Sequence, residues 1–192
     1  MVGRKTIVCF AGGTAGDLVV GVLDPRNCSY DYDHGSINLE EDRYAMQKFW
    51  NFDDDIKKDA YLKEAFKSYD SLPSHDVDFH FKNKTNDVLG ITCFDEDLRR
   101  KSARRFKSLH RPWIWESLRL VTDTETIEKY TNDILKISRK LKDRFNTIDL
   151  EDIIKGNLIK NLQSLGYEIS DEGIKLYETW LKKRPNQIND WA

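Results

Sequence analysis

Apolar runs alternate with amphipathic stretches along most of the chain, and their order predicts an α/β protein. The first run, residues 6–11, is continuous, rich in β-branched residues and stopped by glycines, which is typical of a strand buried on both faces. A second apolar run over residues 18–23 predicts a buried helix that Asp24 and Pro25 end. Strand, glycine turn and helix follow one another so closely that a parallel sheet is expected.

The rest of the chain continues this alternation. Further strands are predicted where short apolar or alternating runs occur, over residues 77–81, 88–94 and 146–150. Apolar residues at helical spacing predict helices over residues 40–52, 55–69, 96–109, 124–145, 157–165 and 170–183. Pro185 is expected to close the last helix, and the polar residues 27–38 are expected to form an exposed loop. No boundary divides the chain, so we predict one domain over residues 1–192.

Charge and cysteine content narrow the classes of partner and compartment. Lys and Arg (31) nearly balance Asp and Glu (33), giving a net charge of -2, so nucleic acid would bind only through a local basic patch. The three cysteines form no CxxC pair, which favours a reducing compartment. No run approaches the roughly 18 apolar residues that a membrane span requires, and the N-terminus lacks the apolar region of a signal peptide. A cytoplasmic protein without a membrane partner is therefore expected.

The turn between the first strand and the first helix is the main candidate for a binding site. It consists of Gly12, Gly13, Thr14, Ala15, Gly16 and Asp17. A helix start leaves backbone N–H groups unpaired and carries partial positive charge, and glycines let the backbone approach a phosphate or sulfate. The Thr14 hydroxyl would add a donor, and Asp17 would cap the helix or receive a substrate proton. The alternative is a tight turn that binds nothing.

Motifs for metal and dinucleotide binding are missing from this turn and from the chain. The sequence has neither GxxxxGK[ST] nor GxGxxG, so a Walker lysine, its neighbouring magnesium-binding hydroxyl and the dinucleotide fingerprint are absent. His34 with Asp31 and Asp33 lacks the EF-hand pattern, and no zinc spacing exists. We expect no metal.

His75 and Asp76 stand at the start of the predicted strand 77–81, at a sheet end where ligands gather in parallel sheets. An aspartate can orient a neighbouring histidine, which then acts as a general base near neutral pH. Ser-His-Asp is also ordinary turn chemistry, and this alternative stays open. His80 follows His75 at an odd spacing on the same predicted strand, so the two are expected on opposite faces.

The predicted helix over residues 96–109 is strongly basic. Arg100 and Arg104 are one turn apart and would clamp a phosphate together, with Arg99 beside them. A solvated charged face is the alternative. Trp113 and Trp115 would stack on a base or sugar, or else lie in the core.

The order of these segments resembles the P-loop sulfotransferase-like family, especially compact, divergent members of the kind found in phages and marine bacteria. Four segments carry the likeness: TIVCFAGGTAGDLVVGVLD, LPSHD, DVLGITCFDEDLRRKSARRF and FNTIDLEDIIKGNLIKNLQSLGYEISDEGIKLYETWLKKRP. The resemblance implies a three-layer, P-loop-like α/β fold, with a parallel sheet flanked by helices and a helical C-terminal part.

The resemblance also implies roles for the candidate residues. Residues 12–17 would cradle the 5′-phosphosulfate of 3′-phosphoadenosine 5′-phosphosulfate, and His75 would be the base. Arg99, Arg100 or Arg104 would meet the 3′-phosphate of this nucleotide. The chain departs from the family in its first loop, because no Lys or Arg lies between Lys5 and Arg26. The family's Arg…Ser pair is also replaced by imperfect stand-ins, which are Thr92, Asp95 and Ser102.

The leading functional expectation is a transferase that moves a sulfuryl group from this nucleotide donor to an unknown acceptor. A phage-type nucleotide or modified-base kinase is one alternative. The other is a non-catalytic protein that kept the fold and binds a nucleotide or another protein.

Overall fold

The computed structural model describes residues 4–31, 36–39, 52, 54–83, 87–109 and 124–188. A four-stranded sheet in the order β4-β1-β5-β6 lies at its centre, and all neighbouring strands in it are parallel. Its strands are β1 (Thr6–Phe10), β4 (Ser71–Ser74), β5 (Asp87–Thr92) and β6 (Asn146–Asp149). The predicted α/β architecture with a parallel sheet is therefore confirmed.

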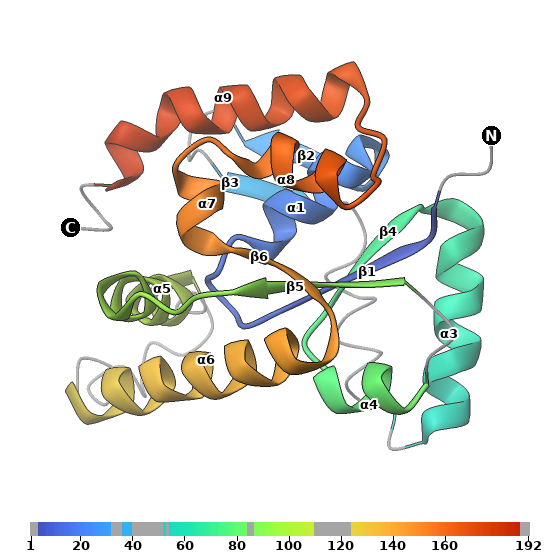
Figure 1. The fold of residues 1–192 in the computed structure, drawn as a ribbon, viewed down its shortest axis with the longest axis horizontal. Helices are drawn as coiled ribbons and strands as arrows, with labels where there is room; N and C mark the ends of the chain where they lie inside the picture. Colours follow the sequence, from blue (N-terminus) through green and yellow to red (C-terminus); the bar gives the residue numbers. More distant parts are fainter. Residues whose placement is uncertain are drawn as a thin grey trace.

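Helices cover both faces of this sheet (Figure 1). The first face carries α1 (Gly16–Leu23), α8 (Leu158–Ser164) and α9 (Asp171–Ile188). The second carries α3 (Asp55–Ser68), α4 (Val77–Lys82) and α6 (Thr124–Arg144). Val8 and Phe10 of β1 pack in the core of the first face, and Ile7 and Cys9 pack in that of the second. This alternation explains why β1 is apolar at every position, since neither face of the strand meets water.

Two further helices, α5 (Glu96–Leu109) and α7 (Leu150–Ile154), follow the carboxyl ends of β5 and β6. The chain leaves β1 through α1 on the first face, and it leaves β5 through α5 and then α6, which packs on the second face. Neighbouring strands whose connections run to opposite faces form a topological switch point, where open α/β sheets bind ligands. The glycine turn follows β1 and lies at this point of the sheet.

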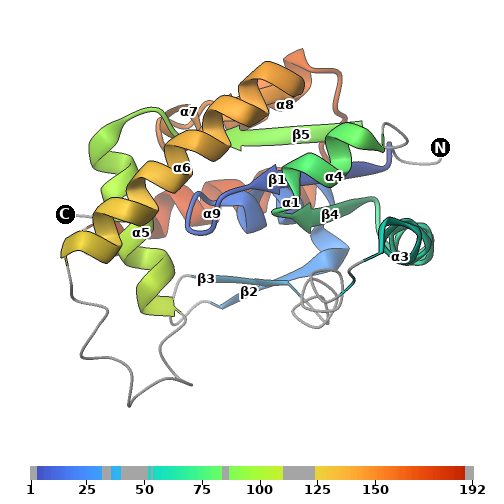
Figure 2. The ribbon, with the colours of Figure 1, turned by 90° about the horizontal axis from the view of Figure 1, so that it is seen from below.

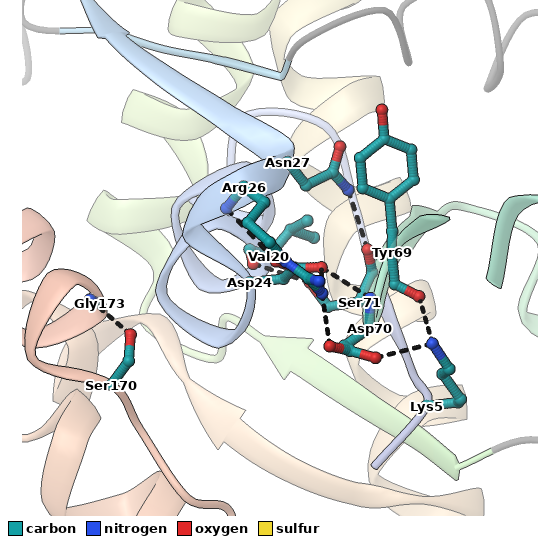
Figure 3. A network of polar contacts seen from close by, with 10 residues as sticks. All are labelled: Lys5, Val20, Asp24, Arg26, Asn27, Tyr69, Asp70, Ser71, Ser170 and Gly173. Carbon is teal, nitrogen blue, oxygen red and sulfur yellow. Dashed lines mark hydrogen bonds and ion pairs between the residues drawn. The ribbon is translucent and has the colours of Figure 1, made fainter. Parts of the chain in front are cut away.

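The amino ends of β1 and β4 are held by a polar network that fixes the far end of α1 (Figure 3). Asp24, which is 2% exposed, accepts hydrogen bonds from Arg26 Nε (2.8 Å) and from the Asp70 backbone N–H (2.6 Å). Asp70 in turn accepts from Lys5 Nζ at 2.7 Å. Ser71 Oγ donates to the Val20 carbonyl at 2.8 Å. These bonds hold the last turn of α1 against the first residues of β4, at the amino end of the sheet. The start of α1 therefore lies at the other end, where β1 finishes.

One predicted strand is wrong. Residues 77–81 form helix α4, and the strand is β4, six residues earlier. The Asp76 carboxylate accepts a hydrogen bond from the Phe79 backbone N–H (3.0 Å) and thereby caps α4. Pro73 lies inside β4, where it is tolerated because β4 is an edge strand of the sheet. His75 and His80 therefore do not lie on one strand.

Two other expectations meet a different outcome. Residues 27–38 were expected to form a loop. They begin with the last residue of η1 (Pro25–Asn27) and continue into an antiparallel pair of strands, β2 (Cys28–Asp31) and β3 (Ser36–Leu39). This pair lies next to α1 on the β4 side of the sheet (Figure 2). The register sets Tyr30 opposite Ile37. Helix α9 continues through Pro185 to Ile188, so this proline does not close the helix as expected.

Some predictions fall on parts of the chain outside the described residues. These are most of the helix predicted over 40–52, His34, Trp113 and Trp115. Among the helices that the structure does describe, none combines the length and the apolar content needed to cross a lipid bilayer.

Candidate functional site

The glycine turn bends the chain from β1 into α1 through two left-handed residues. Gly13 has φ 82° and Ala15 has φ 59° and ψ 22°. A residue with a Cβ is uncommon in this conformation, which costs it about 1–2 kcal/mol relative to the right-handed form. Ala15 is the N-cap of α1, and its side chain makes no capping hydrogen bond. The positive end of the α1 dipole therefore has no side-chain cap at this position.

Most of the turn's own polar capacity is used to close it. The Thr14 hydroxyl donates to the Ala11 carbonyl at 2.6 Å, and the Thr14 side chain is fully buried. Its single proton is therefore committed to the turn and does not face a ligand. Tyr130 of α6 donates from its hydroxyl to the Gly12 carbonyl at 3.5 Å. The partly exposed positions of the turn and of the α1 start are Gly13, Ala15 and Asp17.

Gly16, the first residue of α1, is required by packing. A Cβ built on Gly16 would overlap the ring of Phe10, the last residue of β1. The same ring lies edge-on to the imidazole of His75, with 4.5 Å between the ring centroids. Phe10 therefore connects the start of α1 to the residue that follows β4.

His75 is held beside the glycine turn by its own hydrogen bond. Its Nδ1 is bonded to the backbone carbonyl of Phe10, two residues before Gly12. A carbonyl only accepts, so Nδ1 carries a proton and the lone pair of the neutral ring is on Nε2. The sequence predicted that an aspartate orients this ring, but the carbonyl at the end of β1 does so. The imidazole and the glycine turn thus belong to one edge of the sheet.

Asp76, predicted to act with His75, makes its contacts elsewhere. Its Oδ1 accepts from the Phe79 N–H at 3.0 Å, and its Oδ2 accepts from Lys58 Nζ of α3 at 2.7 Å. Burial alone would raise the pKa of Asp76, but the hydrogen bonds from Lys58 and from the Phe79 N–H outweigh it and lower that pKa. A carboxylate with these partners stabilises α4 and its contact with α3.

The three arginines predicted to bind phosphate separate into two groups on α5. Arg100 and Arg104 are exposed, and Arg100 forms an ion pair with Glu96 at 2.9 Å. The predicted arginine pair thus lies on the solvent face. Arg99 turns inward and is only 7% exposed, and its guanidinium donates to the carbonyl of Phe94.

Arg99 leaves part of its hydrogen-bonding capacity unused. Within the described part of the chain, the Nε of Arg99 has no acceptor. The hydroxyl of Ser102, which is fully buried, has no partner there either. The two residues are three apart and share the inner face of α5. Leu98 and Ala103 beside them belong to the same apolar cluster as Ala11 and Ala15 of the turn. Orphaned buried polar atoms are rare in proteins, so this pair is the strongest sign of an unfilled polar site on α5.

Sequence reasoning missed the residues that organise this edge. The sequence predicts Phe10 only as part of a strand, although its position near the turn could have indicated that its carbonyl orients a neighbour. His80 was assigned to a strand, yet it lies in α4 and is 2% exposed. Burial, with a smaller contribution from Lys58, lowers the pKa of His80 to about 4, and Asp76 opposes this shift.

No cluster of three or more metal-ligating side chains exists among the described residues. Comparison of the chain with models of protein families, with curated proteins and with solved structures finds no match. The likeness to the sulfotransferase-like family is therefore a prediction from the order of motifs in the sequence.

Proposed function

We propose that this protein is a group-transfer enzyme of the sulfotransferase-like kind that binds a phosphoadenosine nucleotide at the glycine turn. The observation that supports it most is the hydrogen bond from His75 Nδ1 to the Phe10 carbonyl. It places the lone pair of the neutral ring on Nε2 and holds the ring at the carboxyl edge of the sheet, the edge at which α1 starts with Ala15 as an N-cap that makes no side-chain hydrogen bond. A base next to an anion site is the arrangement that transfer to a hydroxyl or amine requires.

The proposed reaction is a displacement at sulfur. The acceptor oxygen or nitrogen forms a bond to the sulfur of 3′-phosphoadenosine 5′-phosphosulfate, and the bond from sulfur to the bridging phosphate oxygen breaks. Nε2 of His75 takes the acceptor's proton, and adenosine 3′,5′-bisphosphate leaves. The N–H groups at the start of α1 stabilise the negative charge on the transferred group. Arg99 is the candidate cation, since the turn itself contains no Lys or Arg.

A non-catalytic nucleotide-binding protein is the second candidate. The absence of a cation from the turn favours it, as does the use of Asp76 as a helix cap rather than as a partner of His75. Such a protein would retain the anion site but turn over no donor.

Thermal unfolding with three ligands separates these proposals. Stabilisation by adenosine 3′,5′-bisphosphate, without an effect of ATP and magnesium, supports the sulfotransferase-like proposal. Stabilisation by ATP and magnesium alone indicates a kinase instead. No effect of either nucleotide, nor of sulfate, contradicts nucleotide binding altogether.

The substitution His75→Asn tests the role of this residue as the base. The side-chain amide nitrogen of the variant takes the place of Nδ1 and keeps a donor for the Phe10 carbonyl, but it supplies no base. We expect this variant to bind adenosine 3′,5′-bisphosphate normally. Release of that product from the phosphosulfate, measured over a panel of alcohols, phenols and amines, should fall by about 10²–10⁴-fold. Turnover at the wild-type rate would refute a catalytic His75.

A further inference from the structure

A buried hydroxyl and a buried imidazole join the end of β4 to α4, one residue from His75. Ser74 Oγ and His80 Nε2 are 2.7 Å apart, and both side chains are 2% exposed. The same Oγ accepts a hydrogen bond from the Asp76 backbone N–H at 3.1 Å. Ser74 therefore contacts two residues of the segment that carries His75 into α4.

The direction of the bond between Ser74 and His80 follows from counting protons. A serine hydroxyl has one proton and two lone pairs. If His80 Nε2 donated, the Ser74 proton would be buried without an acceptor, because the other partner of Oγ is a backbone N–H. Ser74 therefore donates to Nε2, and the neutral His80 ring carries its proton on Nδ1. Burial favours this neutral ring.

Residues 74–77 are consequently fixed on both sides of His75. Ser74 is bonded to α4 through His80, and Asp76 is bonded to Lys58 of α3 at 2.7 Å. The Val77 N–H donates to the His75 carbonyl at 3.2 Å. These contacts restrict the backbone of His75, and the backbone in turn restricts where the imidazole ring can lie.

We propose that Ser74 and His80 are positioning residues for His75: their buried hydrogen bond holds the backbone at the end of β4 so that the His75 ring meets the Phe10 carbonyl. This inference rests on the proposed function only where turnover is measured. The orientation of the His75 ring can be observed without any substrate.

Strand β4 supplies a matched control for the experiment. Ser71, at its amino end, is 1% exposed and its hydroxyl donates to the Val20 carbonyl. Ser71→Ala and Ser74→Ala therefore remove the same group from equally buried positions at opposite ends of one strand. We expect the two variants to lose similar amounts of thermal stability.

The discriminating measurement is ¹⁵N-edited NMR of the His75 imidazole. In the wild type and in Ser71→Ala, Nδ1 should be protonated and its proton slow to exchange with water. In Ser74→Ala, that exchange should accelerate by about tenfold, the equivalent of one typical hydrogen bond. The inference is wrong if the His75 signals of Ser74→Ala are the same as those of Ser71→Ala, whether both variants keep the wild-type signals or both change them.

A conservative rescue provides a second test, which holds even if Ser74→Ala does not fold. In His80→Gln, the side-chain amide reaches the former Nε2 position and accepts from Ser74, whereas His80→Leu has no acceptor there. The Gln variant should keep the wild-type His75 signals and the Leu variant should lose them; equal signals in the two would overturn the inference. If the wild type turns over donor, His80→Leu should lose on the order of 100-fold in rate. Intact NMR effects without any turnover would refute the proposed function alone.

Discussion

The buried His80 makes the stability of this protein depend on pH in a way that can be worked out from the structure. An ordinary histidine has a pKa of 6.5, and burial lowers the pKa of His80 to about 4. Between these two values the unfolded chain binds a proton that the folded chain excludes. The free energy of unfolding therefore falls as the pH falls from about 6.5 to about 4. At about 1.4 kcal/mol for each pKa unit, the full loss is about 3 kcal/mol.

Urea unfolding at pH 7, 6 and 5 measures this loss, with His80→Gln as the comparison. The wild type should lose about 2 kcal/mol between pH 7 and pH 5 that the variant does not lose. Contributions from the other histidines cancel, because both proteins contain them. Asp70, Asp76 and Asp78 have lowered pKa values, so the stability that they add is lost only at lower pH, as the pH falls past their ordinary value of 3.8.

The main physical reason is burial, and the hydrogen bond that Ser74 donates to Nε2 is consistent with it. Once Nε2 is protonated, the Ser74 hydroxyl loses its acceptor, and a charge enters a site that is 2% exposed. The charge of Asp76 opposes this effect and that of Lys58 adds to it. If wild type and His80→Gln show the same pH dependence, His80 is not a buried neutral base.

Three further perturbations test the packing and the charges of the structure. Gly16→Ala forces a Cβ against the Phe10 ring and should destabilise the fold by about 1–3 kcal/mol in urea unfolding, whereas relief of this clash by Phe10→Leu should recover part of the loss. Asp24→Ala removes the acceptor of the Asp70 N–H and of the exposed Arg26 side chain, and it should cost about 1–3 kcal/mol, measured by calorimetry. Arg99→Met should abolish stabilisation by adenosine 3′,5′-bisphosphate, and Arg100→Met on the solvent face should leave it unchanged; the opposite order would place the site on the outer face of α5.

Elements with a strong local pattern could be predicted from the sequence. The limits of α5 agree with the prediction, because its first turn is acidic and its apolar positions recur at helical spacing. The continuous apolar run of β1 predicted a strand buried on both faces, and few other interpretations were open. Strand β4 was missed because SLPS contains a proline and is short, and only its parallel pairing with β1, which extends from Ser71 to Ser74, makes it a strand. Alternation over 77–81 then suggested a strand that the Asp76 cap overrides.

The candidate site was predictable in position but not in its contacts. The order of strand, turn and helix located the turn, and His75 does lie at the same edge of the sheet. No spacing rule indicates that a ring will be oriented by the Phe10 carbonyl, since that contact joins two strands distant in sequence. Helical spacing showed that Arg100 and Arg104 share a face, but it could not show that this face is exposed and that Arg99 lies on the opposite one.

The two ends of the sheet differ in the kind of buried polar group that lacks a partner, and this difference bears on function. At the amino end, the carboxylates of Asp24, Asp70 and Asp87 each accept from at least two donors. Among the described residues, three buried side chains retain an atom without a partner: Asn27, through its Oδ1, at the amino end, and Arg99 and Ser102 near the carboxyl end. A fold gains stability by satisfying such groups, so a polar pair left incomplete is expected where a ligand completes it. The carboxylates of the amino end are therefore paired and its orphaned atom is a neutral amide oxygen, whereas the helix that follows β5 carries a buried cationic side chain, Arg99, whose Nε has no partner among the described residues.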